Sequence, residues 1–66
     1  MASQPQLEKR LLRIKPAATY LSVSPWTLRR IVASGDLPVI KLGDHAAWLL
    51  DVRDLDRWVD GHKETL

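Results

Sequence analysis

The sequence predicts a small, mainly α-helical domain with one β-hairpin. Three features predict it: a serine-proline helix start, an alternating segment with turn chemistry, and an aspartate-led amphipathic segment near the C-terminus. The chain has 66 residues, which is enough for one domain. A domain of this size buries only about 60% of the surface that its unfolded chain exposes. The core must therefore be small, and a deep catalytic pocket is not expected.

The first expected helix is short. Residues 1–10 are polar and show no apolar period, so we expect a flexible arm there. An apolar lead-in follows at 11–14. Pro16 fits the first turn of a helix, where its missing N–H costs nothing, and Ala18 and Leu21 lie at i, i+3. We expect about two helical turns, ended by a Ser-Val-Ser turn.

The second expected helix has the clearest boundaries. Ser24 followed by Pro25 is an N-cap with a proline at the first helical position. The helix should continue to about Ser34, and Gly35 should end it in the left-handed conformation.

A hairpin, or wing, is expected next. Alternation places Ile40 and Leu42 on one possible buried face and Lys41 on the other. Gly-Asp at 43–44 is typical of a turn, and 47–50 can return as the partner strand.

Asp51 is a plausible N-cap for a third helix, and Gly61 should close it at C′. Trp48 and Trp58 fall on inward positions and are expected in the core. The apolar residues of this helix recur at helical spacing: Val52, Leu55, Trp58 and Val59.

Charge is divided unevenly along the chain, whose net charge is +2. Residues 1–41 contain seven Lys or Arg and two Asp or Glu, whereas residues 42–66 contain three and six. This asymmetry indicates a basic working face and an acidic opposite side. The acidic third helix is expected to be either a solvated face or a surface for a basic partner.

Several classes of protein are not favoured. The chain has no cysteine, which removes disulfides and thiolate chemistry. Its two histidines match no metal-ligand spacing, and its three glycines are isolated rather than phosphate-cradling. We therefore expect no enzyme, cofactor or metal. Without an apolar run of about 20 residues or a signal core, we expect a soluble, cytoplasmic protein that does not contact a membrane.

The order of elements is helix, three-residue turn, helix, hairpin, helix. A winged helix-turn-helix of this kind places its second helix in the major groove of DNA. Leu28, Ile31 and Val32 should face inward, which leaves Trp26, Arg29, Arg30 and Ala33 facing out.

Arg29 and Arg30 are the strongest candidates for DNA contact. An arginine there can bind guanine O6 and N7 with two hydrogen bonds or clamp a phosphate, and which of the two reads a base stays open. Trp26 could touch thymine methyls or sugars, or fold back over the core. Lys15 and Lys41 are phosphate candidates. His45, at the wing tip, could contact DNA or be a solvated turn residue. Lys9, Arg10 and Arg13 could form a basic arm or belong to a merely solvated tail.

Three segments, LLRIKPAATYLSVS, TLRRIVASGDLPVIKLG and WLLDVRDLDRW, together resemble the excisionase family of MerR-like winged helix-turn-helix DNA-binding domains. The resemblance covers residues 11–59 and implies a folded domain at 11–60 with a short tail at 61–66. This chain departs from the family at Ser22, where glycine is usual, and at Pro25 and Ala33, where basic residues are usual. Its wing has Asp-His-Ala-Ala where the family is rich in arginine.

The resemblance implies a phage or prophage recombination directionality factor. Such a protein binds and bends attachment-site DNA, self-associates there, and biases an integrase, a tyrosine or serine recombinase, toward excision. It implies a recognition helix beginning at Ser24, with Pro25, Trp26, Arg29 and Arg30 facing DNA and Lys15 and Thr27 near phosphates. A small transcriptional regulator is the alternative, and a protein-interaction module that uses the Trp26 face is a further one. The candidate DNA-binding residues are Lys15, Ser24, Pro25, Trp26, Thr27, Arg29, Arg30, Lys41 and His45.

Overall fold

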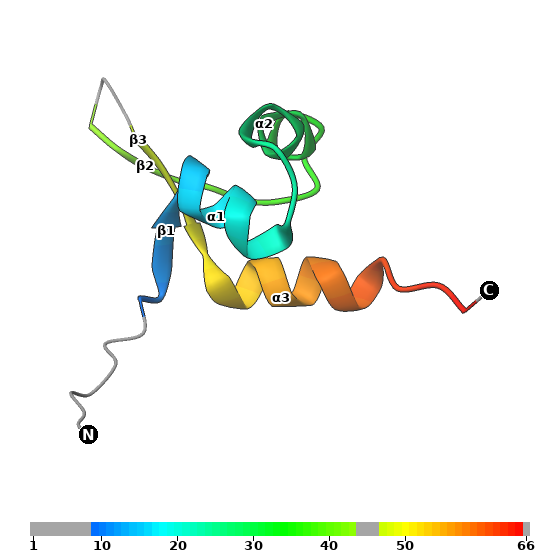
Figure 1. Ribbon diagram of the computed structural model, residues 1–66. Helices are drawn as coiled ribbons and strands as arrows, with labels where there is room; N and C mark the ends of the chain where they lie inside the picture. Colours follow the sequence, from blue (N-terminus) through cyan, green and yellow to red (C-terminus); the bar gives the residue numbers. More distant parts are fainter. Residues whose placement is uncertain (1–8, 44–46, 66) are drawn as a thin grey trace.

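The structure of the protein is a computed structural model that describes residues 9–43 and 47–65 (Figure 1). It contains three helices and a small three-stranded sheet, which confirms the predicted winged helix-turn-helix. The elements are β1 (Leu11–Arg13), α1 (Ile14–Leu21), α2 (Pro25–Ala33), β2 (Ile40–Leu42), β3 (Ala47–Asp51) and α3 (Val52–Gly61).

The sheet is antiparallel, with strand order β1-β3-β2. Strand β1 was not expected, because three residues are too few to show an alternating pattern and their partners lie far along the chain. Leu12 pairs with Leu50, and the N–H of Val52 donates to the carbonyl of Arg10 at 2.8 Å. The β1 strand therefore ties the start of the fold to the junction between β3 and α3.

A tight corner joins α1 to α2. Ser22 has φ 61°, the left-handed conformation that glycine adopts without strain. Its N–H and that of Val23 donate to the carbonyls of Thr19 and Ala18 at 3.0 and 2.9 Å, a Schellman-type ending of α1. In Figure 1, this corner turns the chain so that α2 lies across one side of α1 and α3 lies on another.

The core is formed where the three helices meet the inner face of the sheet. Leu28, Leu50 and Leu55 are its largest fully buried side chains. The complete cluster is Ile14, Ala17, Ala18, Leu28, Leu37, Leu50 and Leu55. Trp48 and Trp58 pack against this cluster but are only half-buried, so their predicted place in the core is confirmed only in part.

The expected burial of Ile40 and Leu42 is wrong, because they are 43% and 60% exposed. The register explains the error. Lys41 pairs with Trp48, and facing residues of antiparallel strands share a side of the sheet. Trp48 and the buried Leu50 are two residues apart on β3, so both lie on the helix side of the sheet. Lys41 therefore lies on the helix side too, at the edge of the sheet. Its two neighbours lie on the outer side.

The predicted end of α2 and the predicted start of α3 are confirmed, but the predicted end of α3 is not. Gly35 has φ 90°, which confirms the left-handed end of α2, and Asp51 caps α3 by accepting from the N–H of Arg53 at 2.9 Å. The prediction that Gly61 occupies C′ is wrong. Gly61 is the last residue of α3, and its φ is not positive. His62 forms the C-cap.

Candidate nucleic-acid interface

The start of α2 is fixed by its N-cap. The hydroxyl of Ser24 accepts a hydrogen bond from the N–H of Thr27 at 3.0 Å and donates one to the Thr27 hydroxyl at 2.9 Å. Pro25 stands at the first helical position. These contacts give Ser24 and Thr27 a structural role, because they hold the first turn in place for the side chains that follow.

The two sides of α2 differ sharply in burial. Leu28 is fully buried, whereas Arg29 and Arg30 are exposed and Trp26 is 65% exposed. The interpretation of Trp26 as a core residue is therefore wrong. Instead, the guanidinium of Arg30 lies over the Trp26 ring, 4.8 Å from its centroid. The outward side of the helix thus presents an aromatic ring and two cations to solvent.

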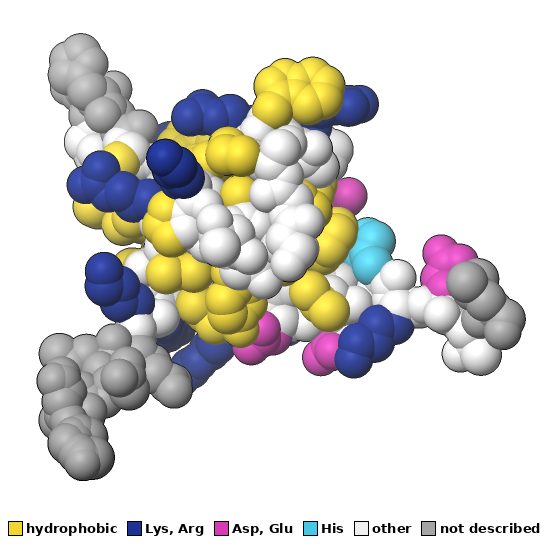
Figure 2. All heavy atoms as spheres, viewed as in Figure 1, with side chains coloured by type: hydrophobic (Ala, Val, Ile, Leu, Met, Phe, Trp, Pro, Cys, Tyr) yellow, Lys and Arg dark blue, Asp and Glu magenta, His cyan; other side chains and the backbone are white. Residues whose placement is uncertain are grey.

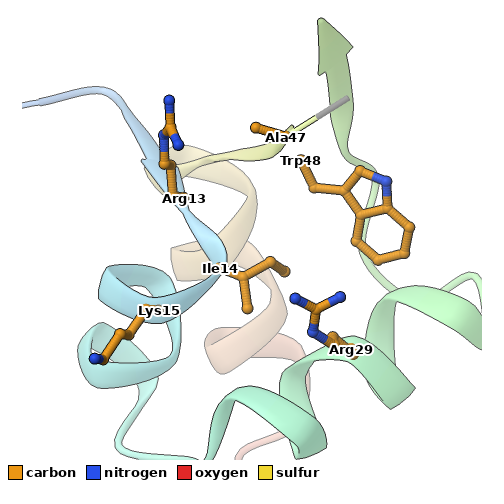
Figure 3. A pocket seen from close by; sticks show the side chains of 6 residues that line it. All are labelled: Arg13, Ile14, Lys15, Arg29, Ala47 and Trp48. Carbon is orange, nitrogen blue, oxygen red and sulfur yellow. The ribbon is translucent and has the colours of Figure 1, made fainter. Parts of the chain in front are cut away.

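A hollow of about 430 Å³ separates α2 from the sheet. It is lined by Arg13, Ile14, Lys15, Arg29, Ala47 and Trp48, which come from β1, α1, α2 and β3. In Figure 3, the Arg29 guanidinium points from α2 into the space between Ile14 and Trp48. The charged ends of Arg13 and Lys15 point outward from the same region, so three cations surround a space without an acidic lining residue.

Lys41 extends this group from the hairpin. It is exposed on β2, and its Nζ lies 6.0 Å from the centroid of the Trp48 ring. His45, a further candidate, falls outside the described residues. The cations of this side will be called the basic surface: Arg13, Lys15, Arg29, Arg30 and Lys41.

Among the described residues, the basic surface has no carboxylate partner. Within residues 9–43 and 47–65, the ion pairs are Arg10–Asp51, Arg57–Asp54 and Lys63–Asp60. None involves the basic surface. In Figure 2, Lys and Arg gather over α2 and the hairpin, while Asp and Glu lie mainly along α3 and toward the C-terminal end. The predicted division into a basic and an acidic side is therefore present in space.

Sequence reasoning missed the place of Arg13, which it grouped with Lys9 and Arg10 as a possible basic arm. Arg13 ends β1 and stands directly before α1, so it shares the hollow with Lys15. The signal that could have located it was the apolar pair Leu11 and Leu12, because a short strand there would bring Arg13 against β3. Arg10 has a different role, since its Nε donates to Asp51 at 3.0 Å.

The described part of the chain holds no group of three or more His, Cys, Asp or Glu side chains placed to share a metal ion. None of its helices has the length and apolar character needed to cross a membrane.

Comparison with known proteins agrees with this geometry. Residues 11–63 match the family described as helix-turn-helix domain. The chain is also 43% identical over 58 residues to the transcriptional repressor DcmR of Methylorubrum extorquens, and the match covers 88% of this chain. The matched part of this chain spans only 22% of that relative's length. No solved structure matches. With the matched segment running from β1 through α3, the chain belongs to the helix-turn-helix domain family of DNA-binding proteins.

Proposed function

We propose that this chain binds a specific duplex sequence by placing α2 in the major groove, as the DNA-binding domain of a transcriptional regulator. One observation carries the proposal: the basic surface is exposed around the second helix of the helix-turn-helix, and none of its cations has a carboxylate partner among the described residues. Unpaired cations on one side provide the charge that neutralises phosphates.

Affinity and sequence preference come from different contacts with DNA. Phosphate contacts supply affinity and fix the orientation of the protein, and contacts with base edges supply sequence preference. Only a few outward side chains of α2 can reach base edges, and each good two-bond contact discriminates by about 1–3 kcal/mol. One copy therefore recognises few base pairs. Two or more copies bound side by side would supply the specificity that a regulator needs.

This proposal gives the wing a smaller part in DNA binding than the resemblance to the excisionase family implies. Asp-His-Ala-Ala replaces an arginine-rich tip, and Lys41 is the one Lys or Arg among the hairpin residues that the structure describes. Narrow minor grooves attract arginine, lysine and histidine through their negative potential. Residues 40–50 contain no arginine, so most of the affinity is assigned to α2 and the hollow, and Lys41 adds a smaller part.

Regulation is favoured over excision by the similarity to DcmR, which is named a transcriptional repressor. The excisionase role and an integrase partner remain predictions from the sequence resemblance. Either role places the protein with chromosomal or phage DNA in the cytoplasm.

Selection of binders from random duplexes, followed by footprinting and affinity measurements at several salt concentrations, tests the proposal. We expect one enriched motif and an affinity that falls steeply with salt, by about 0.9 log units per neutralised phosphate for each decade of salt. No enriched motif, together with an affinity insensitive to salt, would contradict DNA binding and support the protein-interaction alternative.

The enriched motif then separates the two DNA-binding roles. Placed at a promoter upstream of a reporter, it should make transcription depend on this protein. If transcription is unchanged while the protein shifts an integrase assay toward excision, the excisionase role replaces the regulator.

A further inference from the structure

Arg29 and Arg30 are adjacent in sequence but lie in different surroundings. Arg29 lines the hollow between α2, the start of α1 and β3, where Figure 3 shows its guanidinium pointing inward. Arg30 lies on the outer surface over the ring of Trp26. Successive residues of an α-helix point about 100° apart, which accounts for the separation. The two arginines therefore have different ligands within reach.

The surroundings of Arg29 suit an anion. Arg13 and Lys15 line the same hollow, and the residues that line it include no Asp or Glu. No side chain caps the start of α1, where Arg13 is the N-cap residue. The positive end of that helix dipole is therefore not offset by an acidic cap. The Arg29 guanidinium points into this hollow, and Arg13 and Lys15 add positive charge at its rim. An anion is favoured there, and in duplex DNA that anion is a phosphate.

The surroundings of Arg30 suit a base edge. Trp26 and Arg30 are four residues apart, so they are neighbours on the helix surface. An aromatic ring beneath a guanidinium attracts it and restricts its rotamers. Stacking occupies the flat face of the guanidinium and leaves its in-plane N–H groups free. Those groups form the paired hydrogen bonds with O6 and N7 of guanine.

We propose that Arg30 is the base-reading arginine, positioned by Trp26 for a guanine, and that Arg29 binds a backbone phosphate in the hollow. This assignment rests on the proposed function. It goes beyond it in giving the two arginines separate roles and in making Trp26 a positioning residue whose effect on DNA passes through Arg30.

Single substitutions at each arginine, measured on the selected duplex and on its single-base-pair variants, test the assignment. Arg29→Ala should weaken binding to all duplexes by a similar factor and lower the salt slope by about 0.9, the value for one phosphate. Arg30→Ala should lose the preference at one guanine position, by about 5- to 150-fold, while the other positions keep theirs.

Conservative variants provide the matched controls. A lysine is a point charge and serves a phosphate well, so Arg29→Lys should recover most of the affinity. Lysine cannot form the same planar pair of hydrogen bonds, so Arg30→Lys should not recover the lost preference. Loss of a single-position preference in Arg29→Ala, or full recovery in Arg30→Lys, would overturn the assignment.

A double-mutant cycle tests the role of Trp26. Trp26→Ala should reduce the guanine preference of the wild type but have no further effect in an Arg30→Ala background, and Trp26→Phe should restore part of it. An equal loss in both backgrounds would show that Trp26 contacts DNA independently and would overturn its positioning role.

A measurement without DNA separates this inference from the proposed function. In the free protein, the ring current of Trp26 should shift the side-chain protons of Arg30 upfield in an NMR spectrum, and Trp26→Ala should abolish the shift. If the shift is present but the wild type binds no duplex, the proposed function fails while the pair stands. If DNA binds but the shift is missing, the positioning role alone fails.

Discussion

Helices α2 and α3 both carry exposed charges, but they differ in how these charges are paired. Each aspartate of the α3 region has a partner: Arg10 and the N–H of Arg53 for Asp51, Arg57 for Asp54, the hydroxyl of Tyr20 for Asp56, and Lys63 for Asp60. On α2, Arg29 and Arg30 have no ion-pair partner among the described residues.

Under the proposed function, this difference separates charges that serve the fold from charges that bind DNA. Asp51 caps the helix, Asp54 lies near its positive end and Asp56 holds Tyr20 of α1, which are structural uses of charge. Among the described residues, the α2 cations have no ion-pair partner, and Trp26 beside them is 65% exposed. Under the proposed function, the clustered α2 cations without ion pairs mark the binding side better than the number of charges does.

The largest expected effect comes from removing both α2 arginines. Arg29→Ala/Arg30→Ala should weaken binding to the selected duplex at least about 30-fold. A guanine contact contributes about 1–3 kcal/mol, and a hydrogen bond to a charged phosphate about 1.5–3 kcal/mol. The thermal midpoint should change little, because both side chains are exposed.

The matched control is Arg53→Ala/Arg57→Ala, which removes the same charge from α3. This variant should lose only a small, nonspecific part of its affinity for DNA. Titration of a labelled duplex with each variant measures the affinity. Equal losses in the two double variants would show that net charge alone determines binding and that the two helices do not differ.

A pair of substitutions at the N-cap of α2 separates stability from binding. Ser24→Ala should lower the free energy of unfolding by about 1 kcal/mol, because the N–H of Thr27 loses its acceptor. Ser24→Asp retains an acceptor but adds a negative charge at the start of α2. It should therefore unfold near the wild-type midpoint yet bind duplex more weakly. Denaturant titration and fluorescence anisotropy measure the two quantities. Undiminished DNA affinity of Ser24→Asp would contradict the position of Ser24 at the interface.

A smaller effect is expected from the ion pairs of α3. Arg57→Ala removes the 3.0 Å contact with Asp54, but the Arg57 side chain is 77% exposed. Exposed pairs contribute about 0.2–1 kcal/mol, and the lower end of that range applies to a side chain so well solvated. DNA affinity should stay within the error of the assay, and a loss as large as that of Arg29→Ala would place α3 at the interface.

The smallest effect concerns pH. The hydrogen bond from Arg10, followed by that from the N–H of Arg53, lowers the pKa of Asp51 below its ordinary value of 3.8. The carboxylate therefore stabilises the fold above about pH 3.8, and this contribution is lost as the pH falls through the lowered pKa. Thermal midpoints measured from pH 6 to pH 2 should show a steeper acid decline in the wild type than in Asp51→Asn. Parallel curves would contradict the role of the Arg10–Asp51 pair.

Local signals predicted most of the fold. Ser24-Pro25, Gly35 and Asp51 mark helix boundaries through their own backbone and side-chain chemistry, and all three are used as expected. The predicted buried face of the hairpin was wrong, because alternation alone defines two faces without showing which one is buried. Only the pairing of Lys41 with Trp48 decides it.

Nonlocal arrangement explains what the sequence could not predict about the site. The outward position of Arg29 and Arg30 followed from helical period, but their different surroundings depend on how α1 and β3 approach α2. Arg13 joined the site only because β1 pairs with a strand nearly forty residues later in the chain. The contact of Arg30 with Trp26 has the local i, i+4 spacing, yet the exposed position of Trp26 depends on packing that the sequence left open.

The most direct test of the central claim is an NMR titration of the isotope-labelled protein with the selected duplex. We expect the largest chemical-shift changes at Trp26, Arg29 and Arg30 and at the Arg13–Lys15 side of the hollow, with little change along α3. Changes concentrated on α3, with the α2 signals unmoved, would contradict it.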